Sequence, residues 1–233
     1  MYQTARTIIV TGASGNLGQA IIKKFLSAGD RVIGTVIPND PVQIQINDEK
    51  FETAVINLMD ENSSAAFIRD CISKYEKIDA VVLTVGGFGM GLLTGTSTAD
   101  ITKQLMLNFN TAYNIIQPVY THMLQNNFGR IFLIGARPGL SAQHGKNMVA
   151  YSLSKSLLFR LSELINEDAK EKNISATVIV PSIIDTPQNR QSMPEADFDH
   201  WVKPESIADI ISFQCSPAAN AIREPLIKVY GNA

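Results

Sequence analysis

The chain has 233 residues, of which 45% are hydrophobic and 18% charged, with a formal net charge of −2. This length is enough for one domain with a large buried core, and so small a net charge excludes a broad electrostatic footprint for nucleic acid or an anionic membrane. The two cysteines are far apart, and no basic stretch precedes a long apolar run at the start. We therefore expect a cytoplasmic protein without a signal peptide or a membrane span.

Short β-branched runs alternate with longer amphipathic stretches along the chain. The predicted strands are residues 7–11, 31–37, 53–57, 80–85, 130–135, 175–180 and 226–230. The predicted helices are residues 17–28, 62–77, 98–126, 149–172 and 204–214. Apolar strands separated by helices indicate a parallel sheet covered on both faces. The prediction is an α/β fold: a single doubly wound Rossmann-type domain over residues 1–233, with a seven-stranded parallel sheet and helices on both faces.

The first predicted strand runs into a glycine turn, Thr11-Gly12-Ala13-Ser14-Gly15-Asn16-Leu17-Gly18. A strand, a glycine turn and a helix place free N–H groups where the helix dipole favours a pyrophosphate. No Gly-Lys-Ser/Thr follows, so a nucleotide triphosphatase is not predicted. The alternative is a turn that only reverses the chain. We expect NADH or NADPH to bind here, through Gly12, Ser14, Gly15, Asn16, Leu17 and Gly18.

The end of the second predicted strand leaves the choice between NADH and NADPH open. An acid commonly stands there to bind the ribose hydroxyls of NAD, and an arginine nearby can accommodate the 2′-phosphate of NADP. Here the position holds Val36, which can do neither. Asp40 follows in the next loop, either as a substitute for that acid or as a solvated loop aspartate.

Tyr151 and Lys155 stand four residues apart in a predicted helix, so they share one of its faces. A tyrosine pKa of about 10 is high for proton transfer near neutrality, and a neighbouring cation lowers it. We expect Lys155 to have this effect, so that Tyr151 acts as a general acid toward a hydride acceptor. The alternative is a surface pair without function. The glycine turn at the start of the chain favours the catalytic interpretation.

With both signals present, the chain resembles the short-chain dehydrogenase/reductase family over essentially its full length. The resemblance implies a catalytic role for Asn108 beside Tyr151 and Lys155, with Asn110 as a nearby rival. The family's catalytic serine is missing, because Ala136 stands in its place and Ser141 lies too far along. Further cofactor contacts implied by the resemblance are Asn57, Leu58, Gly86, Gly87, Tyr151, Lys155, Pro181, Ser182, Ile184 and Thr186.

Several of these departures are similar to one branch of that family, the dihydropteridine reductases. The branch resembles this chain in its glycine turn, in Gly86-Gly87-Phe88, in Gly135-Ala136-Arg137 and in residues 185–198. This resemblance implies a homodimer that reduces quinonoid dihydropteridine to tetrahydropteridine by hydride transfer, with residues 183–203 as a substrate loop or lid. The implied substrate contacts are Phe88, Ala136, Met193, Phe198 and Trp201.

Other functions stay open at this point. The chain can instead reduce another conjugated substrate, such as a quinone or a carbonyl compound. It can also bind the cofactor without turnover, which the change to Ala136 suggests and the retained Tyr151, Lys155 and Asn108 oppose. The aromatic residues of the lid either contact a substrate or only pack the loop down. Three scattered histidines predict no metal site.

Overall fold

The computed structural model describes residues 5–232 of the chain. Its centre is a seven-stranded sheet with the order β3-β2-β1-β4-β5-β6-β7. The strands are β1 Thr7–Thr11, β2 Arg31–Val36, β3 Phe51–Val55, β4 Ala80–Leu83, β5 Phe128–Ile134, β6 Asn173–Pro181 and β7 Leu226–Val229. All neighbouring strands pair in parallel, which confirms the predicted α/β fold.

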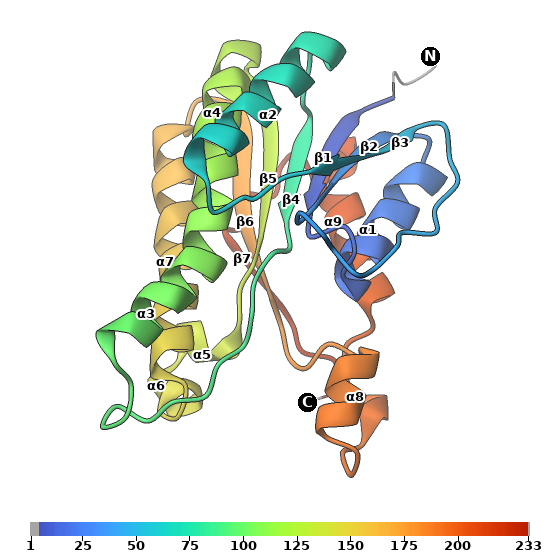
Figure 1. Ribbon diagram of the computed structural model, residues 1–233. Coiled ribbons are helices and arrows are strands. Elements are labelled where there is room, and N and C mark those ends of the chain that lie inside the picture. The colour runs from blue at the N-terminus through green and yellow to red at the C-terminus, as the bar shows by residue number, and fades with distance from the viewer. Residues whose placement is uncertain (1–4, 233) are drawn as a thin grey trace.

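Helices cover both faces of this sheet. They are α1 Asn16–Ser27, α2 Glu61–Tyr75, α3 Thr98–Leu105, α4 Thr111–Asn126, α5 Arg137–Leu140, α6 Ala142–Gly145, α7 Val149–Asp168, α8 Pro187–Ser192 and α9 Pro204–Gln214. Helices α1 and α9 pack on one face, and α2, α4 and α7 pack on the other (Figure 1). Among the described residues, none of the helices has the length and apolarity needed to cross a membrane.

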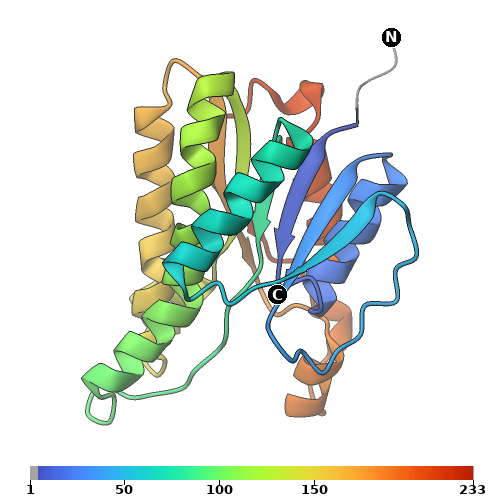
Figure 2. The ribbon, with the colours of Figure 1, turned by 45° about the horizontal axis from the view of Figure 1, so that its top comes forward.

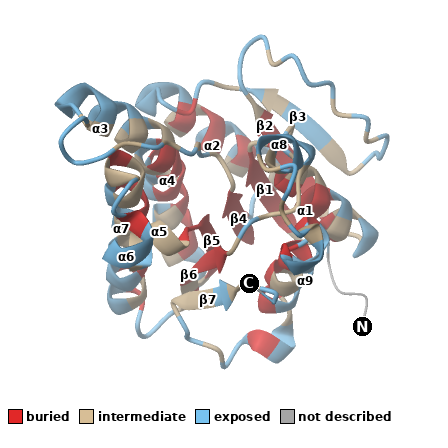
Figure 3. Ribbon diagram, turned by 90° about the horizontal axis from the view of Figure 1, so that it is seen from below, coloured by how far each residue is buried: buried red, intermediate tan, exposed pale blue. Residues whose placement is uncertain are grey.

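The order of the strands reverses between β1 and β4. From β1 the chain proceeds outward through β2 to β3, and it then returns beside β1 to build β4, β5, β6 and β7. Ligands of open α/β sheets bind at the carboxyl ends of the strands beside such a reversal. Figure 3 views the sheet from this side, with α8 near β1 and β2 and with α5 and α6 near α7.

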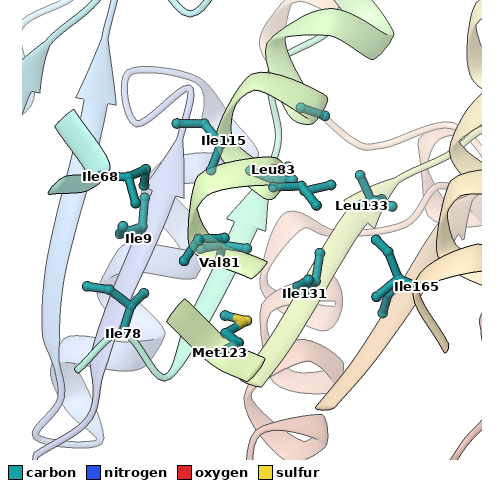
Figure 4. Close-up of a cluster of buried hydrophobic side chains, with 14 of the residues drawn as sticks. Ile9, Ile68, Ile78, Val81, Leu83, Ile115, Met123, Ile131, Leu133 and Ile165 are labelled. Atoms are coloured by element: carbon teal, nitrogen blue, oxygen red, sulfur yellow. The ribbon is translucent and has the colours of Figure 1, made fainter. Parts of the chain in front are cut away.

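Two clusters of buried hydrophobic side chains, one on each face, join the layers. Figure 4 shows part of the larger cluster, in which Leu83 of β4 lies among residues of two helices, Ile115 of α4 and Ile165 of α7. Each fully buried side chain of this kind contributes about 1.5–3 kcal/mol. Cys71 and Cys215 lie in these clusters as free thiols, and burial raises the pKa of each to about 12.

The observed elements differ from the predicted ones where the apolar pattern weakens. Strand β3 begins at Phe51, two residues before its predicted start, because an edge strand is partly exposed and shows less apolar character. The predicted helix 98–126 contains a π-helical segment, Met106–Asn110, between α3 and α4. Residues 183–203, predicted to be a substrate loop or lid, contain α8 and a 3-10 turn at Phe198–His200.

The connection between β2 and β3, residues 37–50, bows away from the edge of the sheet (Figure 2). Its first part turns tightly, because Asp40 N donates to Ile37 O at 3.2 Å and Asn39 adopts a left-handed conformation with φ 58°. Asparagine tolerates this conformation better than most residues. The turn brings Asp40 back toward the glycine turn that precedes α1.

Candidate active site

The turn between β1 and α1 packs so closely against its neighbours that it leaves no room for a side chain at Gly12 or Gly18. Gly12 has φ 65°, and a Cβ there would lie 2.8 Å from Thr84 Oγ1, just after β4. A Cβ at Gly18 would overlap the carbonyl oxygen of Gly12. Thr84 Oγ1 also donates to Thr11 O at 2.6 Å. The turn is therefore fixed at the reversal between β1 and β4, and Gly12 and Gly18 allow the close approach.

Helix α1 presents an uncapped amino terminus at this turn. Gly15 is its N-cap residue, with φ −71° and ψ 157°, and no side chain caps the helix. The first turn of α1 carries no acidic residue. An oxygen of a bound phosphate satisfies such backbone N–H groups and interacts favourably with the helix dipole. The residues of the turn therefore fit the pyrophosphate of a dinucleotide.

Asn108 lies in the π-helical segment Met106–Asn110 and is buried. Its Oδ1 accepts from Gly87 N at 2.9 Å. Its Nδ2 lies 3.0 Å from Gly87 O, 2.6 Å from Gln104 Oε1 and 3.1 Å from Ser154 Oγ, all of which are acceptors. One side chain thus joins the loop after β4 to helix α7. Insertions of a π-turn into an α-helix are frequent at functional sites.

Gly86 brings the loop after β4 against two predicted catalytic residues. A Cβ at this position would lie 2.6 Å from Asn108 Oδ1 and 3.1 Å from Lys155 Nζ. The structure therefore places Gly86, Asn108 and Lys155 together at the carboxyl edge of the sheet. The rival Asn110 is exposed, which favours Asn108 as the functional asparagine.

Burial changes the pKa of both members of the predicted catalytic pair. Lys155 is buried, its Nζ donates to Ile134 O at 2.7 Å, and its pKa is lowered from 10.5 to about 8. Burial also raises the pKa of Tyr151 to about 12. The expectation that Lys155 lowers the pKa of Tyr151 is therefore wrong for this structure, because loss of contact with water dominates for the phenol.

We expect Lys155→Met to stabilise the protein near pH 7, although Lys155 belongs to the site. The folded state binds the Lys155 proton more weakly than the unfolded state does, so the buried charge costs stability below pH 8. The shift corresponds to roughly 3 kcal/mol. Loss of the hydrogen bond to Ile134 O offsets about 1 kcal/mol of the gain. Urea denaturation near pH 7 measures the difference.

The pH dependence distinguishes this account from a simple packing effect. As the pH rises from about 8 to about 10.5, the folded protein has already lost the Lys155 proton and the unfolded chain has not. The wild-type protein therefore gains stability in this window, and the advantage of Lys155→Met shrinks. Lys103→Met, at an exposed position of α3, is the control. The prediction is contradicted if Lys155→Met is less stable than wild type near pH 7.

Phe88 lies beside Tyr151 at the exposed rim of the site. Its ring is 64% exposed and meets the Tyr151 ring edge-on, with centroids 5.3 Å apart and planes at 70°. Gly91 N donates to Asn147 O at 2.8 Å, which ties the same loop to the residues before α7. Ala136 follows β5 and is buried, so this position offers a methyl group and no hydroxyl. The structure thus brings Phe88 to the site, and the residue at position 136 supplies no hydroxyl there.

The loop 183–203 packs largely on itself. Trp201 is buried, and its ring centroid lies 4.8 Å from that of Phe198. The guanidinium of Arg190 lies over the Phe198 ring at 4.7 Å and donates to both carboxylate oxygens of Asp185 at 2.6 and 2.7 Å. These contacts favour packing of the loop as the role of Phe198 and Trp201, while Met193 is half-buried near the tip of the loop.

One contact joins this loop to the glycine turn, and no sequence signal indicated it. Asn16 Nδ2, at the start of α1, donates to Gln188 Oε1 in α8 at 2.8 Å. Thr186 begins α8 as its N-cap, with Oγ1 accepting from Asn189 N at 3.2 Å. The loop therefore lies against the predicted cofactor site from the side of α1.

The remaining predicted cofactor contacts lie at the ends of β3 and β6. Leu58 is buried, and Asn57 is exposed. Ser182 Oγ donates to Tyr230 O at 2.8 Å, so its hydroxyl is used within the fold. Pro181 ends β6, and Ile184 forms an isolated bridge with Val202. Among the described residues, no group of three histidine, cysteine, aspartate or glutamate side chains could hold a metal ion.

Comparisons with known proteins agree with this geometry. A family model described as short chain dehydrogenase matches residues 6–197. The 3-oxoacyl-[acyl-carrier-protein] reductase FabG of Buchnera aphidicola is 26% identical over 237 residues, which cover 97% of this chain and 96% of that protein.

Two solved structures are also similar over nearly the whole chain. An oxidoreductase of the short chain dehydrogenase/reductase family from Burkholderia thailandensis has a TM-score of 0.84 and 25% identity, covering 98% of this chain and 92% of its own. ElxO with NADP bound has a TM-score of 0.88 and 21% identity, covering 98% of each chain.

Proposed function

This chain belongs to the short-chain dehydrogenase family, and we propose that it is an NAD(P)H-dependent reductase with Tyr151 as its proton donor. The observation that carries the proposal is the meeting of Gly86, Asn108 and Lys155 at the strand reversal, beside an anion-binding turn. The Buchnera aphidicola relative is named a reductase, and ElxO has NADP bound. The first name supports reduction as the direction of reaction, and the second supports a nicotinamide dinucleotide as the cofactor.

When bound, the cofactor supplies a hydride to the substrate. The N–H groups at the start of α1 would bind its pyrophosphate, and the backbone at Gly86 would form a wall of the site. Asn108 holds this wall in place through its paired hydrogen bonds to Gly87. Lys155 lies against the same wall. The Tyr151 hydroxyl donates a proton to the substrate atom on which negative charge develops.

Burial leaves the Tyr151 hydroxyl in its acid form. With a pKa of about 12 it is protonated throughout the neutral range, as a phenol with the ordinary pKa of about 10 also is. The environment lowers its acidity, which costs driving force for the proton transfer.

We propose quinonoid dihydropteridine as the substrate. Ala136 provides no hydroxyl to bind an isolated ketone oxygen, and a conjugated ring needs only one proton donor. The exposed Phe88 ring beside Tyr151 offers an apolar surface to a planar ring system. A 3-oxoacyl thioester is the second candidate, which the name of the Buchnera aphidicola relative favours. A quinone is the third, since it too is planar and conjugated.

A substrate panel tests this proposal. Purified protein with NADH or NADPH receives quinonoid dihydropterin, a quinone or a 3-oxoacyl thioester, and the products are identified. The proposal expects the highest kcat/KM with the dihydropterin. A higher value with the thioester would assign the chain to the acyl reductases. Cofactor binding without turnover of any of the three would favour the non-catalytic alternative.

We further propose that the chain is one NAD(P)-binding domain whose loop 183–203 acts as a lid over the substrate. The hydrogen bond between Asn16 and Gln188 supports this role, because it links the loop to the start of α1. The location in the cytoplasm stays a prediction from composition.

We also propose a homodimer formed through the outer face of α7. Leu153, Leu157 and Leu164 are exposed on one face of this helix, which lies at the outside of the molecule beside α4 (Figure 1). An apolar stripe of this kind is typical of an interface between subunits. Burial of the stripe against a second copy of α7 would remove it from water.

Leu164→Glu is expected to convert the dimer into monomers. Leu164 is 60% exposed, so the substitution leaves the fold of one chain intact and places a charge in the proposed interface. Light scattering after size-exclusion chromatography measures the mass. Val55→Glu, at a 64% exposed position of β3, is the control and should remain dimeric. A wild-type mass equal to one chain overturns the proposed homodimer.

A further inference from the structure

We infer that Asp40 selects the cofactor by holding a carboxylate at the glycine turn, so that the protein prefers NADH to NADPH. The inference rests on the proposed function, because it concerns the adenosine half of the cofactor. It assigns a role to a residue outside the strand end that normally carries the selecting acid. That strand end here holds Val36.

Both oxygens of the Asp40 carboxylate are held in place. Ser14 Oγ donates to Oδ2 at 2.6 Å, and Val42 N donates to Oδ1 at 2.9 Å. These hydrogen bonds lower the pKa of Asp40, so the group is ionised at neutral pH. Ser14 belongs to the glycine turn, and its carbonyl oxygen accepts from Gln19 Nε2 at 2.9 Å. The carboxylate is therefore part of the wall of the turn and is not a freely solvated loop group.

The surrounding loop offers no cation to a 2′-phosphate. Residues 37–49 contain no lysine or arginine, and they contain three acids, Asp40, Asp48 and Glu49. The next basic residue is Lys50, whose Nζ donates to Gly29 O at 3.1 Å. Gly29 precedes β2, so this contact holds the Lys50 ammonium at the amino end of that strand, away from the carboxyl ends where the glycine turn lies. The loop thus presents negative charge where the adenosine half of a dinucleotide is expected.

The two cofactors differ in how they interact with such a carboxylate. The ribose of NADH has a free 2′-hydroxyl, which can donate to the carboxylate in a charge-assisted hydrogen bond. The 2′-phosphate of NADPH has no proton to donate near neutrality and carries about two negative charges, so it is repelled. Without an arginine or lysine in the loop, this repulsion is not balanced. The arrangement therefore favours NADH.

Direct binding without substrate tests the inference. Calorimetry of the full chain with NADH and NADPH, and with ADP and 2′,5′-ADP as adenosine fragments, gives four dissociation constants. We expect the unphosphorylated partner of each pair to bind about tenfold more tightly or better. Asp40→Asn should bring each pair close to parity, because the charge is gone. The amide oxygen can still accept from Ser14 Oγ, while the hydrogen bond from Val42 N is lost.

Asp48→Asn is the matched control, since it removes the same charge from the same loop. The Asp48 carboxylate accepts from Lys50 N at 2.8 Å, and among the described residues it has no hydrogen bond with the glycine turn. This variant should keep the wild-type preference. The inference is overturned if wild type binds NADPH as tightly as NADH, or if both variants change the ratio equally. If no nucleotide binds at all, the proposed function fails together with the inference.

Discussion

Tyr151→Phe is expected to lower kcat by about 10²–10⁴-fold while leaving the dissociation constant for NADH or NADPH almost unchanged. The substitution removes one hydroxyl and retains the aromatic ring, so the edge-on contact with Phe88 is kept. Proton donation to the developing charge is lost, but the glycine turn that binds the pyrophosphate is untouched. Single-turnover kinetics, with cofactor binding measured separately, distinguishes the two effects.

Tyr113→Phe is the control for this experiment. Tyr113 lies on α4 and is 44% exposed, with its ring stacked against Phe109 at 5.8 Å, so the same hydroxyl is removed at a remote position. Its kcat should equal that of wild type. Unchanged turnover in Tyr151→Phe would show that another group donates the proton, and loss of cofactor binding would show that the residue supports the structure of the site.

Gly18→Ala is expected to abolish measurable cofactor binding and to destabilise the protein by about 1–3 kcal/mol. The added Cβ would overlap the carbonyl oxygen of Gly12. A backbone atom cannot move aside as a flexible side chain can, so the turn must shift away from α1. The N–H groups of the first turn then lose the alignment that a pyrophosphate needs. Calorimetry with NADH and thermal unfolding measure the two effects.

Gly95→Ala provides the comparison, because a Cβ at Gly95 would meet nothing within 4 Å. This residue lies in the loop between β4 and α3, and its replacement should leave both cofactor affinity and stability near the wild-type values. If Gly18→Ala bound NADH as wild type does, the glycine turn would not be the pyrophosphate site. The assignment of the cofactor to the reversal between β1 and β4 would then fail.

The fold was predictable from the sequence because a parallel sheet is buried on both faces. Strand β1, Thr7–Thr11, is buried along its entire length and its bounds were predicted correctly. The edge strand β3 was misplaced by two residues, because exposure on the outer side weakens the apolar pattern. The π-helical segment around Asn108 was not predicted, and the hydrogen bonds of Asn108 join it to Gly87 and Ser154, which lie far away in the sequence.

The structure brings the predicted catalytic residues together, but their electrostatics could not be predicted from the sequence. Spacing placed Tyr151 and Lys155 on one face, and the structure keeps both beside Gly86 and Phe88. Their pKa values depend on how far each side chain is removed from water, which spacing does not report. The role of Asp40 likewise depends on a tight turn in the loop that returns its carboxylate to Ser14.

The central claim is that this protein transfers a hydride from the cofactor to its substrate, and the isotope content and rate of cofactor oxidation test it most directly. The reduced pterin holds the added hydrogen on a ring nitrogen, where it exchanges with water, so the label is followed in the cofactor. The purified protein is given quinonoid dihydropterin with reduced nicotinamide cofactor that is unlabelled or deuterated at the transferable position, and single-turnover oxidation of the cofactor is timed. The account predicts slower oxidation of the deuterated cofactor and an oxidised cofactor that has lost the deuterium, at a rate that Tyr151→Phe lowers. No oxidation of NADH or NADPH, or an oxidised cofactor that keeps the deuterium, would contradict it.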